Sequence, residues 1–269
     1  MTVNAYMGGL IDVHCHLTGD DYAAEGGVDE VVKRAKESGV SRMICSGFDL
    51  ASSKEAAALS ERFDEVYFCA GFHPSELGKY REGDLGEIKA LCVHPKCVAV
   101  GEIGLDYHFD DNPSRQTQKE FFLKQLSIAD ELGLPVVIHS RDAAQDTLEL
   151  LRKNAGLLKM GGLMHCYSYS PEMVEGFEGL GLYFSFGGPC TFKNARKVVE
   201  SAALVSAERI LTETDCPYLT PVPHRGEFPN QPKNVAFVAE KLAEVRDVAL
   251  ETFKAQVFEN AKKLFFKLK

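Results

Sequence analysis

The chain alternates eight times between a short apolar segment and a segment whose apolar residues have helical spacing. Short apolar runs are typical of buried parallel strands, and strands that alternate with helices are typical of α/β folds. Eight such units in 269 residues fit one (β/α)8 barrel, the TIM-barrel fold. No linker divides the sequence, so we predict a single domain over residues 1–269. A doubly wound open sheet is the alternative, but it does not normally need eight units.

The apolar runs and the helical spacing give the expected elements. Strands are predicted at 11–17, 42–45, 66–71, 97–103, 135–139, 163–165, 182–186 and 209–212. Helices are predicted over 28–38, 52–62, 84–93, 114–132 and 142–153, with others beginning near 171, 194 and 234 and a last one closing the chain. Ser52 or Ser53 is the expected N-cap of the second helix.

Asp12, His14 and His16 form an alternating polar pattern in the first expected strand. Because side chains in a strand alternate between its two faces, these three residues share one face, while apolar residues occupy the other. Neutral imidazole is a common ligand for Zn, Mn, Fe, Co and Ni. A metal site therefore explains two imidazoles at this spacing, and a strand end whose histidines meet water is the alternative.

Polar residues also stand where most other strands are expected to end. In a (β/α)8 barrel these ends meet on one face, which carries the chemistry. The set is His14, His16, Glu102, His139, His165 and Asp215, with His73 just past its strand. Left unpaired in a confined site, such groups would carry a large desolvation cost, which divalent ions remove. Four histidines and two carboxylates are enough for two metals bridged by one carboxylate.

The composition restricts location and partners. With 30 basic and 39 acidic residues, the net charge of −9 disfavours a broad electrostatic grip on duplex nucleic acid. No apolar run is long enough to cross a membrane, and no secretory signal is visible. The eight cysteines are scattered without a Cys-x-x-Cys pair, as is typical of reduced thiols. We expect a cytoplasmic protein without a membrane partner, and a monomer is the default expectation.

The motifs around these residues resemble those of TatD-type metal-dependent deoxyribonucleases, a branch of the amidohydrolase-like barrels. They run nearly from end to end of the chain and are Asp12-Val-His-Cys-His, Gly71-Phe-His-Pro, Gly101-Glu-Ile-Gly-Leu-Asp-Tyr, His139-Ser-Arg-Asp-Ala, His165-Cys-Tyr, Glu213-Thr-Asp-Cys-Pro-Tyr-Leu, Pro221-Val-Pro-His-Arg-Gly and Glu259-Asn-Ala-Lys-Lys-Leu-Phe. The resemblance implies two divalent ions per chain. It assigns one ion to His14, His16 and Asp215 and the other to His139 and His165, with Glu102 as the bridge. Imidazole-rich sites suit Zn or Mn, whereas members of the family are often supported by Mg.

The resemblance implies a 3′–5′ exodeoxyribonuclease that acts on single-stranded DNA or DNA ends. A metal pair activates water and neutralises the phosphate. Asp215 is the expected acceptor of the water's proton, so Asp215 and Glu102 are the predicted catalytic residues; a pure ligand role for Asp215 is the alternative. A hydrolase of a cyclic amide, a lactone or a small nucleotide ester would use a similar centre and is the rival hypothesis.

Further residues are predicted to support this chemistry. Substrate contacts are expected from His73, Arg141, His224 and Arg225, although Arg141 could equally pair with a carboxylate. Asp12 and Glu213 face inward by strand parity and are expected to orient a ligand histidine. Phe72, Tyr107 and Tyr167 lie beside site residues in the sequence and could stack on bases, with core packing as the alternative.

One segment departs from the family pattern. Glu227, in the proline-rich loop after the last strand, stands where relatives usually place a basic residue, and the loop is one residue longer. Glu227 repels phosphate if it faces the substrate. It holds Arg225 in place if the two side chains pair. The sequence leaves both interpretations open.

Overall fold

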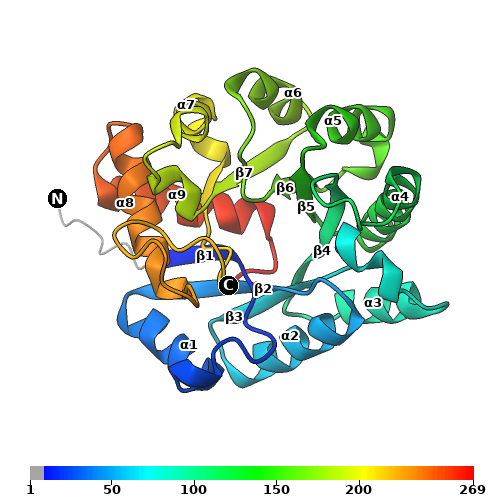
Figure 1. The fold of residues 1–269 in the computed structure, drawn as a ribbon, viewed down its shortest axis with the longest axis horizontal. Helices are drawn as coiled ribbons and strands as arrows, with labels where there is room; N and C mark the ends of the chain where they lie inside the picture. Colours follow the sequence, from blue (N-terminus) through cyan, green and yellow to red (C-terminus); the bar gives the residue numbers. More distant parts are fainter. Residues whose placement is uncertain (1–8) are drawn as a thin grey trace.

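The computed structural model describes residues 9–269, and in it eight parallel strands form one sheet in the order β1 to β8, surrounded by helices (Figure 1). The strands are β1 (Leu10–Cys15), β2 (Val40–Ser46), β3 (Val66–Ala70), β4 (Cys97–Asp106), β5 (Val136–Arg141), β6 (Gly162–Met164), β7 (Leu182–Phe186) and β8 (Ile210–Thr212). The predicted (β/α)8 barrel is confirmed.

Nine α-helices cover the outside of the barrel in the described part of the chain. They are α1 (Gly27–Glu37), α2 (Leu50–Arg62), α3 (Asp84–Cys92), α4 (Arg115–Leu132), α5 (Ala144–Lys153), α6 (Val174–Glu178), α7 (Arg196–Leu204), α8 (Val235–Val245) and α9 (Leu250–Leu264). Amphipathic helices bury their apolar side, as α5 does with Leu148 and Leu151. None of the described helices is long and apolar enough to cross a membrane.

The barrel nearly closes where the ends of β1 and β8 meet. The backbone amide of His16 donates to the carbonyl oxygen of Cys216 at 2.7 Å, and that of Asp215 donates to the carbonyl of His14 at 3.0 Å. Residues that are about 200 positions apart in the sequence are thereby held side by side. This closure brings the two ends of the predicted metal-ligand set together.

Three local predictions differ from the structure. The N-cap of α2 is Asp49, not Ser52 or Ser53, because Asp49 and Ser52 form a reciprocal capping box across the first turn. The helix expected from residue 171 is a 3-10 turn, Pro171–Met173, followed by the five-residue α6. Strand β4 continues beyond the predicted end at residue 103 to Asp106, and all of its residues are buried.

Gly104 explains how β4 stays paired with β5 beside the site. Its φ of 146° lies in a region that other residues rarely adopt. A Cβ atom at this position would lie 1.9 Å from the carbonyl oxygen of His139. The glycine therefore allows the two backbones to approach closely and carries Glu102 and His139 into the same site.

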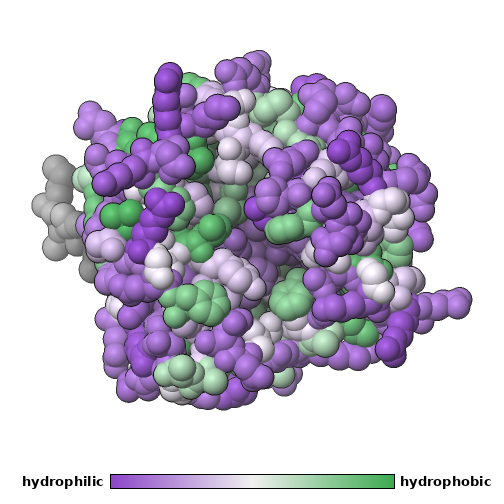
Figure 2. Space-filling model, in the orientation of Figure 1, coloured by the Kyte–Doolittle hydropathy of each residue, from purple (hydrophilic) through white to green (hydrophobic). Residues whose placement is uncertain are grey.

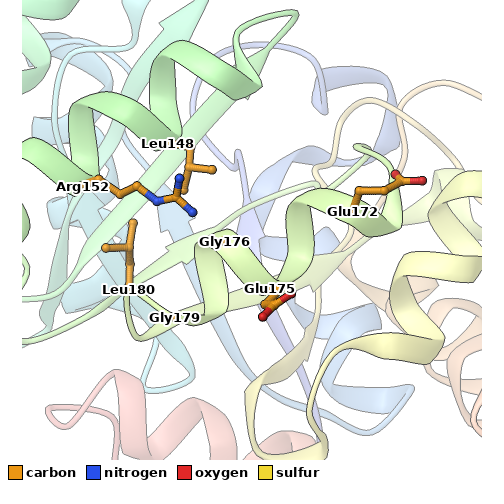
Figure 3. Close-up of a pocket in the computed structure, with 7 residues that line it drawn as sticks. All are labelled: Leu148, Arg152, Glu172, Glu175, Gly176, Gly179 and Leu180. Carbon is orange, nitrogen blue, oxygen red and sulfur yellow. The ribbon is translucent and has the colours of Figure 1, made fainter.

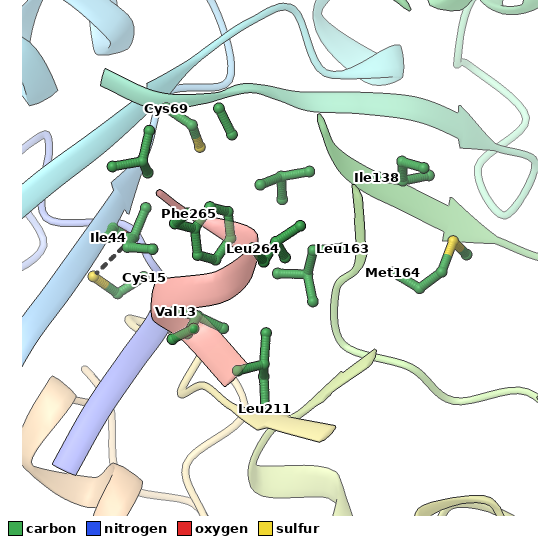
Figure 4. Close-up of a cluster of buried hydrophobic side chains, with 14 of the residues drawn as sticks. Val13, Cys15, Ile44, Cys69, Ile138, Leu163, Met164, Leu211, Leu264 and Phe265 are labelled. Carbon is green, nitrogen blue, oxygen red and sulfur yellow. Dashed lines mark hydrogen bonds between the residues drawn. The ribbon is translucent and has the colours of Figure 1, made fainter. Parts of the chain in front are cut away.

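The end of α9 and the short tail after it cover the N-terminal end of the barrel. Leu264 and Phe265 lie buried among side chains from the strands (Figure 4). Beyond them, Lys269 reaches the starts of two strands: its amide donates to Tyr67 Oη at 3.1 Å, and its carbonyl accepts from Arg42 Nε at 2.6 Å. The core is thus closed at this end, and the opposite end is left for chemistry.

Candidate metal centre

The six predicted ligands all lie in the C-terminal halves of strands or just beyond the strand ends. They are His14 in β1, His16 just past it, Glu102 in β4, His139 in β5, His165 after β6 and Asp215 after β8. Figure 2 shows a hollow near the middle of one face of the molecule, with hydrophilic residues inside it. This end of a (β/α)8 barrel is the one that carries active sites.

Glu102 stands at the centre of the cluster. Its Oε1 lies 2.8 Å from His139 Nδ1 and 2.7 Å from His165 Nε2. Its Oε2 lies 3.3 Å from His14 Nε2 and 3.7 Å from His16 Nε2. The two oxygens of one buried carboxylate therefore face two different pairs of imidazoles.

Asp215 adds a second carboxylate to one of these pairs. Its Oδ1 lies 3.4 Å from His16 Nε2 and 3.6 Å from His14 Nε2. Asp215 has a φ of 54°, in the left-handed region that is uncommon for residues other than glycine. The backbone bond to His14 holds this turn, which aims the carboxylate at the two histidines.

Ser46 in β2 holds the outer nitrogens of both histidines from β1. His16 Nδ1 lies 2.9 Å from the Ser46 carbonyl oxygen, and Ser46 Oγ lies 3.0 Å from His14 Nδ1. A neutral ring that donates from Nδ1 carries its lone pair on Nε2. In the neutral ring, the lone pair of His16 Nε2 therefore faces the carboxylate oxygens of Glu102 and Asp215. All of these atoms are hydrogen-bond acceptors, so none of them can donate to another.

Asp106 holds His139 in the same way, and the sequence analysis did not single it out. His139 Nε2 lies 3.1 Å from Asp106 Oδ2, which leaves Nδ1 to face Glu102 and His165. Asp106 Oδ1 accepts from the backbone amide of His108 at 2.8 Å. Strand parity from Glu102 would have identified Asp106, four residues further along β4, had the strand been predicted to its full length.

The donor set fits divalent cations. Imidazole lone pairs and ionised carboxylates that face one another need a cation or a proton between them. Mixed nitrogen and oxygen ligands are those that Zn and Mn accept. Five groups of three residues in the described chain have ligand atoms within 4.8 Å of one another, and three of the groups consist only of predicted ligands. These three are His14, His16 and Glu102; His14, His165 and Asp215; and Glu102, His139 and His165.

The protonation of the metal-free cluster reflects the same demand for positive charge. Burial lowers the pKa of His16, but the hydrogen bond to Asp215 and the charges of Glu102 and Asp215 outweigh it and raise this pKa to about 9. Burial by itself would raise the pKa of Glu102, yet the surrounding histidines hold it well below its usual range. In the metal-free protein, protons on the histidines supply the positive charge that bound cations would otherwise supply.

Glu213 and Asp12 lie behind the ligands, in the inward-facing positions that the alternation of side chains along the strands predicted. Glu213 Oε1 is 3.7 Å from His165 Nδ1, and its other oxygen accepts from the Ser185 hydroxyl. Asp12 accepts from the amide of Thr214 at 2.9 Å and from that of His14 at 3.3 Å. Asp12 therefore braces the backbones of β1 and of the turn after β8. The ring-orienting role expected of Asp12 belongs to Ser46 instead.

His73 lies at the edge of the cluster, with its Nε2 3.6 Å from Glu102 Oε1. The backbone amide of Ser75 donates to His73 Nδ1 at 3.2 Å, so the proton of the neutral ring is on Nε2. Burial lowers the pKa of His73 to about 3, and the nearby His139 adds to the effect. His73 thus offers an uncharged N–H donor toward the centre of the site.

Of the other predicted substrate contacts, Arg141 is the last residue of β5, and His224 and Arg225 lie in the loop between β8 and α8. The guanidinium of Arg141 lies over the ring of Phe109 at 5.1 Å, and that of Arg225 lies over Phe192 at 4.1 Å. His224 Nδ1 pairs with Glu227 Oε1 at 3.0 Å. The pairing of Glu227 with Arg225 that the sequence left open is therefore wrong, because Glu227 is taken by His224 and Arg225 by an aromatic face.

The aromatic residues suggested for base stacking are not free to stack. Phe72 and Tyr167 are only 2% and 3% exposed and belong to the core. The hydroxyl of Tyr107 donates to Asp146 at 2.8 Å, and the guanidinium of Arg115 covers its ring at 4.3 Å. Core packing, the alternative, is the correct interpretation for Phe72 and Tyr167.

A groove of about 500 Å³ lies on the outside of the barrel between α5 and α6 (Figure 3). It is lined by Leu148, Arg152, Glu172, Glu175, Gly176, Gly179 and Leu180. None of the predicted site residues lines it. The groove is therefore separate from the metal centre.

Comparison with known proteins agrees with this geometry. The chain matches the family of TatD-related DNases over residues 11–266. The chain belongs to this family. An uncharacterized metal-dependent hydrolase, YabD of Bacillus subtilis, is 42% identical over 95% of this chain and 98% of its own length. The 3′-5′ ssDNA/RNA exonuclease TatD of Shigella flexneri is 30% identical over 95% of this chain and 98% of that protein.

Solved structures place the chain in the same group. YjjV, a TatD homologue from Escherichia coli, superposes with a TM-score of 0.89 at 30% identity, covering 97% of this chain and 99% of that one. The TatD resemblance inferred from the motifs is confirmed. The chain is therefore a metal-dependent hydrolase of the TatD family.

Proposed function

We propose that the chain is a two-metal phosphodiesterase that acts as a 3′–5′ exodeoxyribonuclease on single-stranded DNA or DNA ends. The position of Glu102 carries the proposal, because its two oxygens face separate imidazole pairs. A carboxylate in this position could serve as a ligand of both ions in a metal pair. The name of the Shigella exonuclease supports the choice of nucleic acid as substrate.

The residues divide between two ions in this proposal. His14, His16 and Asp215 would hold one ion, His139 and His165 would hold the other, and Glu102 would be a ligand shared by both. The imidazole-rich set favours Zn or Mn, with Mg as the alternative. When bound, such a pair supplies Lewis-acid activation of water and neutralises charge on the phosphate.

The protein's own groups orient the reactants and move the proton. Asp215 stays ionised because the neighbouring histidines lower its pKa against the effect of burial, so it can accept the proton of the attacking water. Ser46 and Asp106 fix the rings of the ligand histidines. His73 donates from Nε2 to a phosphoryl oxygen, and Arg141 and Arg225 lie further out, where flanking phosphates would pass.

The charge and shape of the chain favour ends and single strands. With a net charge of −9, little counterion release is available to hold a long duplex. The ligands lie inside the C-terminal mouth of the barrel, which a single strand can enter more easily than a duplex. We further propose that the protein acts as a monomer in the cytoplasm, where its eight free cysteines would stay reduced.

Digestion of an end-labelled single strand with Zn, Mn or Mg tests the proposal. We expect stepwise loss of 3′ nucleotides, slower on blunt duplex and absent on closed circles. Glu102→Gln is the control for contaminating nucleases, because it keeps the shape of the side chain and removes its charge. A cyclic amide of the dihydroorotate type is assayed in parallel. Turnover of the amide without nuclease activity would contradict the proposal, as would equal rates on circular and linear strands.

A further inference from the structure

The loop between β8 and α8 exposes a group of apolar side chains that the metal centre does not use. Ten large hydrophobic residues are exposed in the described chain, and four of them lie in this loop: Tyr218, Leu219, Val222 and Phe228. Single apolar residues on a surface are ordinary, but a local group of them marks a contact surface. The two rings, Tyr218 and Phe228, are 56% and 61% exposed.

The loop holds these rings in a defined position. The amide of Tyr218 donates to the carbonyl of Asp215 at 3.1 Å, and the carbonyl of Tyr218 accepts from Asn230 Nδ2 at 2.7 Å. Thr220 Oγ1 donates to the carbonyl of Glu227 at 2.6 Å, which ties the two arms of the loop together. Exposed aromatic side chains on a fixed backbone lose little entropy on binding a partner.

Tyr218 lies beside the metal cluster. It follows Asp215 by three residues in a turn closed by their backbone bond. The ring of Phe228 is 6.3 Å away, tilted by 40°. Together the two rings form an aromatic edge next to Asp215.

The charges around this edge select what can lie on it. Glu227, which is exposed and directly precedes Phe228, and Asp215, which is bonded to the amide of Tyr218, are carboxylates, so a phosphate on this edge would meet like charge. A neutral planar group is not repelled. A nucleobase is neutral, offers a π face for stacking, and in three of the four bases carries an amino group that donates to carboxylates.

We infer that Tyr218, with Phe228 beside it, stacks on the base of the terminal nucleotide whose phosphodiester lies at the metal cluster. The inference rests on the proposed nuclease function and adds the feature of the substrate that is recognised. The base would lie on the aromatic edge, and its phosphate would be directed inward to the ions that Glu102, Asp215 and the histidines would hold. Recognition of this kind tolerates any base, because every base has a π face.

Two single-stranded oligonucleotides that differ only at the 3′-terminal residue test the inference, one with a normal base and one abasic. Binding is followed by fluorescence anisotropy with a slowly hydrolysed terminal phosphorothioate, and KM and kcat are measured on the ordinary diester. The wild type should bind the normal end roughly tenfold more tightly, as expected for one aromatic stack. Tyr218→Ala should abolish that difference through KM, and Tyr218→Phe should keep it.

Phe266→Ala is the matched control, because Phe266 is an exposed ring (49%) at the closed end of the barrel; it should behave like the wild type. An equal loss on both oligonucleotides in Tyr218→Ala, or no loss, would overturn the stacking role. Binding that depends on the ring without cleavage would leave the stacking role intact and contradict the nuclease proposal. Cleavage that does not depend on the Tyr218 ring or on the terminal base would support the nuclease proposal and contradict the stacking role. If the protein neither cleaves the strand nor binds it through the ring, both proposals are contradicted.

Discussion

The metal centre and the loop rim above it differ in how their side chains are held. At the centre, six ligand-type residues come from strand ends, and several of their rings are fixed from behind, as Ser46 and Asp106 fix His14 and His139. At the rim, Arg141, Arg225 and Glu227 are exposed, and each touches one neighbouring side chain. A fixed centre suits chemistry that is sensitive to position, and an adaptable rim suits a substrate that varies in sequence.

The largest effect that tests the difference between centre and rim is expected from a substitution at Glu102. Glu102→Ala should lower activity at least about a thousandfold, because it removes the charge that both imidazole pairs face. Metal content, measured by plasma mass spectrometry, should fall below the two ions per chain expected for the wild type. The exposed Glu82→Ala is the control, and a thermal melt checks folding. Full activity in Glu102→Ala would rule out the bridging role.

The next largest effect is expected at Asp106. Asp106→Asn should weaken Zn binding roughly 10–100-fold, the usual cost of losing a carboxylate that holds a ligand histidine. Isothermal titration measures the affinity, and Asp111→Asn, on an exposed stretch just beyond β4, is the matched control. If Asp106→Asn binds Zn as tightly as the wild type, His139 does not depend on this contact.

The pH dependence of metal binding comes third. In the metal-free protein the pKa of His16 is raised to about 9, so at pH 7 the ring is protonated and a metal must displace that proton. Zn affinity should therefore rise with pH, by up to about tenfold per unit between pH 7 and 9 for one proton displaced. Titrations in two buffers of different ionisation enthalpy count the protons released. An affinity independent of pH in this range would show that His16 is not a ligand.

The smallest effect is expected at the rim. Glu227→Lys should tighten single-strand binding by at most about fivefold at low salt, because exposed charges contribute no more than about 1 kcal/mol. The gain should shrink as salt is added, and kcat should stay unchanged. Glu227→Gln, which breaks the pair with His224 without adding a charge, separates the two contributions. An effect on kcat comparable to that of Glu102→Ala would remove the distinction between centre and rim.

The metal centre and the rim also differ in how much of each could be predicted from the sequence. Strands have a period of two residues, so a polar residue that closes an apolar run locates both a strand end and a face of the barrel. His14, Glu102 and His139 were found in this way. Asp106 was missed because β4 runs three residues further than its apolar pattern suggested.

Contacts at the rim could not be read from the sequence, because they depend on which loops meet. Nothing local to Arg225 indicates that Phe192, more than 30 residues away, lies beneath its guanidinium. Tyr167 follows a ligand histidine closely, yet it turns into the core between rings from β7. Tyr218 also follows a predicted ligand, Asp215, by a few residues, but its side chain is exposed whereas that of Tyr167 is buried. Tertiary packing decides these cases.

The tail that closes the barrel has a consequence for how the protein is made. Leu264, Phe265 and Lys269 cover the end of a barrel whose first strand is synthesised long before them. Until β8 and these residues are made, that strand lacks both its neighbour in the sheet and the residues that cover its base. We therefore expect the incomplete barrel to stay accessible to chaperones until this segment has left the ribosome.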